Sequence, residues 1–102
     1  MCGVMKVDFS KVILDLKGEP VKDGEKDFTL GDVAQNALLM PYPDEKELDG
    51  KAKVERFMIA TTAALGGEQD ISAEDVALIK KLIAKAYGPL VVGRSYQIIE
   101  GK

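Results

Sequence analysis

Two segments of the chain carry the signature of a helix start, and they constrain the fold more than any other feature. Residues 28–33 (FTLGDV) and 71–76 (ISAEDV) share one pattern, in which an apolar residue, a hydroxyl residue and two further residues precede Asp and Val. The hydroxyl of Thr29 or Ser72 can accept a hydrogen bond from the backbone N–H three residues later, and the Asp at that position can accept one in return. The pattern therefore predicts a helix directly after each hydroxyl residue.

The ends of these two helices, and a further helix near the C-terminus, follow from proline, glycine and apolar spacing. The first helix is predicted over 30–40, because Pro41 lacks the backbone donor and disfavours helix in the residue before it. The helix over 73–87 has a wide apolar face, which predicts a central place in the core. Residues 90–100 fit a helix or a strand, and the Gly-Pro pair before them favours helix.

Between these segments, residues 50–65 are predicted to form a second helix. Asp49 is a suitable N-cap, and the Gly pair at 66–67 suits a helix end. We expect the residues that recur at three- and four-residue spacing, most of them apolar, to face the core. They are Val54, Phe57, Met58, Thr61, Ala64 and Leu65. The charged residues predicted on or beside the solvent-facing side are Lys51, Lys53, Glu55 and Arg56.

The N-terminal part reads as extended chain with turns. Residues 13–16 and 20–22 flank Gly18, and they are predicted to pair as a short hairpin. A lone hairpin is marginal in water, so it must pack on the helices. We therefore predict one α+β domain over residues 1–102, in which a small N-terminal β-hairpin (region 11–28) packs on three to four helices (region 29–102).

The composition excludes several kinds of chemistry. Histidine is absent and Cys2 is the single cysteine, which rules out Cys/His zinc sites and a Cys–His nucleophile pair within one chain. The acidic segment 44–49 does not match a calcium loop, because Lys46 and Leu48 occupy two of its ligand positions, so we expect a solvated loop. We predict no cofactor, no metal and no enzymatic activity.

Charge and hydropathy bound the partners. A net charge of −3 argues against nucleic-acid binding, and no apolar run approaches the ~20 residues that span a bilayer. A lone cysteine forms no internal disulfide and fits a cytoplasmic protein. We expect a protein partner or self-association.

Five residues are candidates for an interface, because Arg and Tyr are enriched at binding hot spots and because the last helix is apolar on several sides. They are Tyr42, Arg56, Arg94, Tyr96 and Ile98. Each has an alternative: a tyrosine can lie at the edge of the core, and an arginine can be a solvated charge on a helix. The last helix can bury its second side on a partner, on a second copy, or under the hairpin of the same chain.

Three stretches, residues 14–21, 29–39 and 72–93, together resemble a family of small uncharacterised proteins encoded in tailed-bacteriophage and prophage genomes. The resemblance implies a viral gene product made in the cytoplasm of a host bacterial cell, and it carries no functional residue. Our expectation is a non-enzymatic accessory or assembly protein that acts through protein–protein interaction. The alternative is a host-directed inhibitor or regulator, of an anti-defence type, that binds and blocks a bacterial protein complex.

Overall fold

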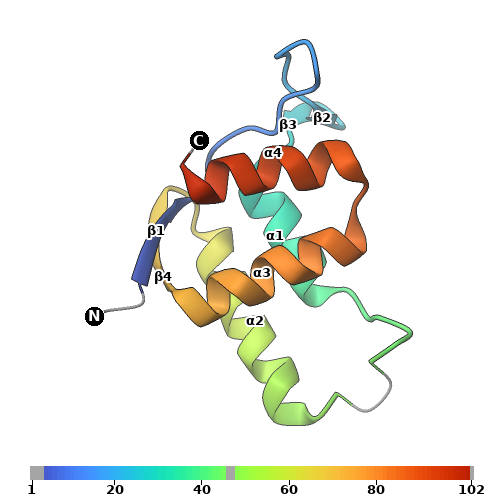
Figure 1. Cartoon of the computed structure of the whole chain (residues 1–102), viewed down its shortest axis with the longest axis vertical. Coiled ribbons are helices and arrows are strands. Elements are labelled where there is room, and N and C mark those ends of the chain that lie inside the picture. Colours follow the sequence, from blue (N-terminus) through green and yellow to red (C-terminus); the bar gives the residue numbers. More distant parts are fainter. Residues whose placement is uncertain (1–3, 46–47, 102) are drawn as a thin grey trace.

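The computed structural model describes residues 4–45 and 48–101, and within them the chain has the predicted α+β fold. Figure 1 shows two small antiparallel sheets beside a group of helices. In chain order the elements are β1 (Val4–Asp8), β2 (Lys22–Asp23), β3 (Lys26–Asp27), α1 (Leu30–Leu39), α2 (Gly50–Ala64), β4 (Glu68–Ser72), α3 (Ala73–Ala86) and α4 (Pro89–Glu100).

The helices begin where the caps predict. Thr29 and Asp32 form a complete capping box, with the Asp32 N–H 3.2 Å from the Thr29 hydroxyl oxygen. The Ser72 hydroxyl accepts from the Asp75 N–H at 3.1 Å, and the Asp49 carboxylate accepts from the first turn of α2. Each cap satisfies a backbone donor that the helix itself cannot pair.

Helix α3 has the central place that its wide apolar face predicted, since it packs against α1, α4, β1 and β4 and buries four apolar residues. Helix α1 shares this position: it packs against α2, α3 and α4, and in Figure 1 it lies behind α3 with α2 and α4 on either side. Small residues make this possible, because Gly31, Ala34 and Ala37 of α1 are all buried and let neighbouring elements approach its axis closely.

The predicted hairpin is present, as backbone hydrogen bonds rather than full strands. The Val21 N–H donates to the Ile13 carbonyl and the Asp15 N–H to the Glu19 carbonyl, both at 2.8 Å. The same ribbon continues into β2 and β3, which turn at Gly24 with a positive φ of 70°. This segment projects from the helices at the top of Figure 1.

A second sheet, which the sequence pattern did not predict, joins the two halves of the chain. Strand β1 pairs antiparallel with β4, from Val4 opposite Ser72 to Asp8 opposite Glu68. Val7 and Ile71 on these strands are buried in the core. Because β4 ends at the cap of α3, the sheet fixes the N-terminus of the described chain against that helix.

The last helix is covered within the chain. Ser95 and Ile99 of α4 are buried, and Val91, Val92 and Ile98 are packed against the core. Of the alternatives for the second side of α4, this geometry favours burial within the same chain over burial on a partner or a second copy. Of the helices in residues 4–45 and 48–101, none is both long and apolar enough to cross a membrane.

Candidate functional site

Helix α2 has two apolar faces on opposite sides. Its inward face buries Arg56, Ile59, Ala60 and Ala63. The prediction that Val54, Phe57, Met58 and Leu65 face the core was wrong, because these side chains are exposed. We define the outer α2 face as Val54 (58% exposed), Phe57 (55%), Met58 (59%) and the adjoining Leu65 (75%).

The reason for this inversion is a close approach between α1 and α2. A Cβ atom placed on Gly31 would lie 3.0 Å from the backbone oxygen of Ala63 in α2. Only small side chains fit between two helices at such a crossing. The alanines of α2 therefore turn inward, and its larger residues turn to the opposite side.

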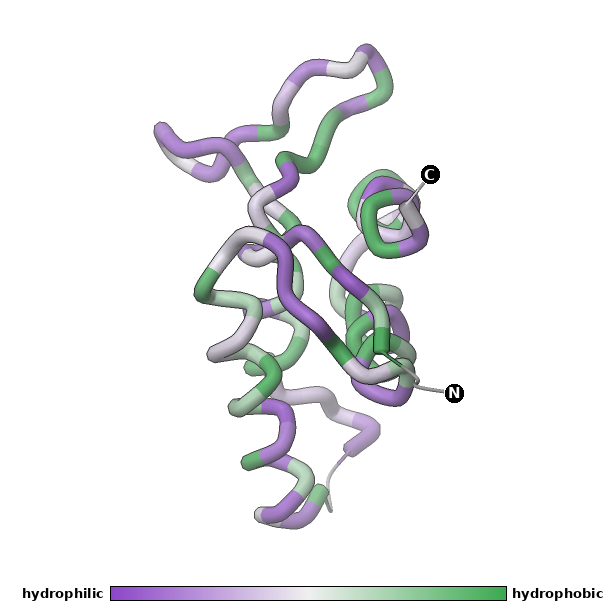
Figure 2. The backbone as a smooth tube through the Cα atoms, turned by 90° about the vertical axis from the view of Figure 1, so that its left-hand side faces the viewer, coloured by the Kyte–Doolittle hydropathy of each residue, from purple (hydrophilic) through white to green (hydrophobic). Residues whose placement is uncertain are grey.

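The N-terminal half of α2 extends beyond the other helices (Figures 1 and 2). A pocket of about 350 Å³ lies on one flank of this half, between α2, the end of α1 and the segment that connects them. Its lining includes Leu39, Met40 and Lys53, and Leu39 is also among the exposed apolar residues. The outer α2 face is thus an apolar ridge with a pocket beside it.

An ion-pair network anchors the connection between α1 and α2. The Arg56 guanidinium donates two hydrogen bonds to Glu45, at 2.7 and 2.8 Å, and Lys85 of α3 lies 3.5 Å from the same carboxylate. Lys85 also pairs with Asp44 at 2.9 Å. Hydrogen bonds from Arg56 lower the pKa of Glu45 to about 2.

Two expectations are corrected by this network. Arg56 is 8% exposed, so it is not a solvated charge on the outside of α2. The side chain of Glu45 is 16% exposed, so this part of the acidic segment 44–49 is not a solvated loop. Residues 46 and 47 of that segment lie outside the described residues. A bidentate pair with little exposure holds its partners in one geometry far better than a surface pair does.

The two predicted tyrosines are held inside the chain. The Tyr42 hydroxyl donates to the carbonyls of Ala37 and Leu82, and burial raises the pKa of Tyr42. The Tyr96 hydroxyl donates to the Lys80 carbonyl at 2.9 Å. Both side chains are partly buried, which agrees with the alternative that these tyrosines lie at the edge of the core.

Arg94 and Ile98, the candidates on α4, also make intrachain contacts. The Arg94 guanidinium donates to the carbonyls of Leu14 at 3.1 Å and Asp15 at 2.7 Å, which holds the hairpin on α4. Ile98 packs against the core. Of the five candidates, the structure brings only Tyr42 and Arg56 together, in the lining of the pocket beside α2.

The residues of the outer α2 face were assigned to the core by sequence reasoning, although the sequence contains a signal for the opposite assignment. Ala52, Ala60 and Ala63 recur at helical spacing on the side opposite Phe57 and Met58. A helix with two apolar faces either buries both within the chain or leaves one exposed. The spacing alone does not say which of these occurs.

The site offers a binding surface, and the described residues supply no metal centre beside it. Among residues 4–45 and 48–101, no group of three or more His, Cys, Asp or Glu side chains is placed to hold a metal ion. No family model, curated protein or solved structure matches this chain.

Proposed function

We propose that this protein is a non-enzymatic interaction module that binds a protein partner through the outer α2 face. The observation that carries the proposal is the exposure of Val54, Phe57 and Met58, each more than half exposed on one regular helix. Apolar and aromatic residues grouped in this way are typical of binding surfaces, whereas isolated exposed apolar residues are not.

The outer α2 face can contribute part of the free energy of binding through burial of its apolar side chains. Covering a Val, Leu, Phe or Met side chain fully contributes about 1.5–3 kcal/mol, so residues that are half exposed each retain on the order of 1 kcal/mol or more. The helix backbone that carries these four residues is already formed, so they supply the centre of a small interface, and further contacts must add to them to offset the cost of association. An acidic domain without a catalytic constellation fits an accessory or assembly role, and the resemblance supports such a role among phage gene products.

Site-specific photo-crosslinking in the cell that naturally produces the protein tests this proposal. A photoreactive phenylalanine analogue at Phe57 is expected to give a discrete adduct with one polypeptide. The same analogue at Glu25, in the exposed turn between β2 and β3, serves as the control. The double variant Met58→Asp, Leu65→Asp should lose the adduct while keeping its circular dichroism spectrum, because both side chains are exposed.

The identity of the adduct separates the two expectations from the sequence. A virion or head- and tail-assembly protein supports the assembly role, and a host enzyme or defence protein supports the host-directed inhibitor. If no adduct forms at Phe57, or if the adduct at Glu25 is equally strong, an interaction through α2 is refuted.

A further inference from the structure

A groove lies on the flank of α2 that faces the start of α3. It has a volume of about 390 Å³ and consists entirely of described residues. Val54, Met58 and Ile59 of α2 form its apolar part, and Met58 and Val54 also belong to the outer α2 face. The groove is therefore continuous with the proposed binding surface.

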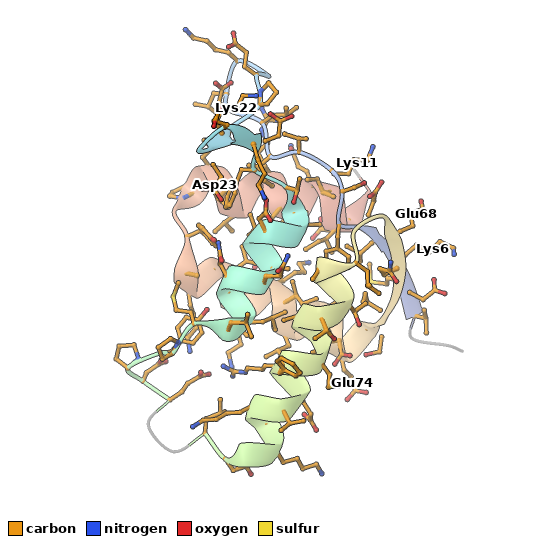
Figure 3. The ribbon with its side chains drawn as sticks, turned by 180° about the vertical axis from the view of Figure 1, so that it is seen from behind. Lys6, Lys11, Lys22, Asp23, Glu68 and Glu74 are labelled. Atoms are coloured by element: carbon orange, nitrogen blue, oxygen red, sulfur yellow. The ribbon has the colours of Figure 1, made fainter. Side chains whose placement is uncertain are left out.

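The walls of this groove are acidic. Glu55 of α2 stands on one side, and Glu74 and Asp75 of α3 stand on the other. Figure 3 shows Glu74 beside α2 in the view from behind. Among the described residues, none of these three carboxylates takes part in an ion pair.

The other flank of α2 differs in charge. There Glu45 is neutralised by Arg56 and Lys85, and Lys53 adds a further positive charge to the pocket lining. Glu74 and Asp75 lie at the N-terminal end of α3, where the helix dipole favours negative charge. Within the part of the chain that the structure describes, this end of the helix contributes no Lys or Arg side chain to the groove. The groove thus combines an apolar floor with acidic walls whose carboxylates have no ion-pair partner among the described residues.

We propose that this groove binds an amphipathic helix of the partner that carries Lys or Arg along one edge of its apolar face. This inference rests on the proposed function and specifies the chemistry of its partner. The partner's apolar residues, spaced at i, i+4 and i+7, lie over Val54 and Met58. Its basic residues reach Glu55, Glu74 and Asp75.

Symmetry and charge favour this occupant over a second copy of the chain. The 15 residues of α2 span about 22 Å, which matches a partner helix of three to four turns. A two-fold pairing centred on this groove would bring the same carboxylates of both copies together, and each copy carries a net charge of −3. Like charges placed opposite one another oppose such a dimer.

A displayed library of short helices tests the proposal with the intact protein. The library keeps a constant apolar face and randomises the flanking positions among Lys, Glu and Gln. Selection on the wild-type protein is expected to enrich Lys at the positions along one edge. Selection on the variant Glu55→Lys, Glu74→Lys should enrich Glu there instead.

Affinity measurements on a selected helix complete the test. The double charge reversal is expected to weaken a Lys-edged helix about tenfold or more, whereas Asp23→Lys, Glu25→Lys makes the same change in net charge far from the groove and should leave affinity within about twofold. Met58→Asp should abolish binding.

The outcomes that count against the inference are distinct. Selection without charge preference, selection of Glu on the wild-type protein, or a library that yields no binder would overturn it. Neutral binders that are still lost in Met58→Asp would refute the basic edge and leave the outer α2 face as the binding surface. A failure of crosslinking at Phe57 would instead refute the proposed function itself.

Discussion

The substitution Gly31→Ala tests the close contact between α1 and α2 that places the alanines of α2 inward and its larger apolar residues outward. The added Cβ would lie 3.0 Å from two backbone oxygens, those of Ala63 in α2 and of Phe9 after β1. Neither is the end of a flexible side chain that can move aside. The Phe9 carbonyl also accepts the Gly31 N–H at 2.8 Å, so moving it apart strains a hydrogen bond.

The size of the effect follows from two opposing contributions. Inserting a methyl group into a tightly packed contact costs about 1–3 kcal/mol. Replacing Gly by Ala in a helix stabilises it by about 1 kcal/mol. Because the clash here comes from two sides, we expect a net loss of about 1–2 kcal/mol in the free energy of unfolding, which corresponds to a fall in Tm of roughly 4–16 °C for a domain of this size.

The matched control is Gly93→Ala in α4. A Cβ on Gly93 meets nothing within 4 Å, and the residue lies in the interior of a helix. This variant should gain about 0.5–1 kcal/mol from helix propensity alone. Urea unfolding followed by circular dichroism measures both. If Gly31→Ala is as stable as Gly93→Ala, the close crossing of α1 and α2 does not explain the orientation of α2.

Further predictions concern the caps, the buried ion pair and the C-terminal helix. Thr29→Ala and Ser72→Ala should each cost about 0.5–2 kcal/mol in thermal unfolding, and a silent change would mean that the cap bonds contribute nothing. Because the pKa of Glu45 is lowered to about 2 in the folded protein, its ion pair contributes stability above the ordinary Glu pKa of 4.5, and this contribution is lost as pH falls through about 2. Glu45→Gln should therefore be less stable than the wild type at pH 6 and should approach it near pH 2, and parallel pH profiles would contradict this. Because Ile98 packs against the core, Ile98→Asp should unfold the protein rather than dissociate an oligomer. Circular dichroism and light scattering on the wild type and the variant would show which of the two occurs. A chelator should leave Tm unchanged, and a large fall would indicate a metal-dependent fold.

None of the five interface candidates chosen from the sequence lies on the outer α2 face. Arg and Tyr were chosen for their frequency at binding surfaces, but this chain uses them to join its own elements. Arg94 holds the hairpin through two carbonyls, and Arg56 holds the connection before α2. The chain has two arginines, and both are used for contacts within the chain.

What the sequence by itself determined is the position of the helices. Their starts depend on Thr29, Asp49 and Ser72, whose caps act within three residues, and the end of α1 depends on Pro41. These are local effects of backbone hydrogen bonding, so a short window of sequence contains all the information they need.

Only the tertiary structure decided which side of α2 is buried and that β1 pairs with β4. Both depend on residues distant in the chain, since Gly31 sets the distance at which Ala63 can pack and Val7 lies beside β4 only after the chain has folded. A helix with two apolar faces can bury either one. Its closest neighbour selects the face that fits, and the face left over becomes the surface available to a partner.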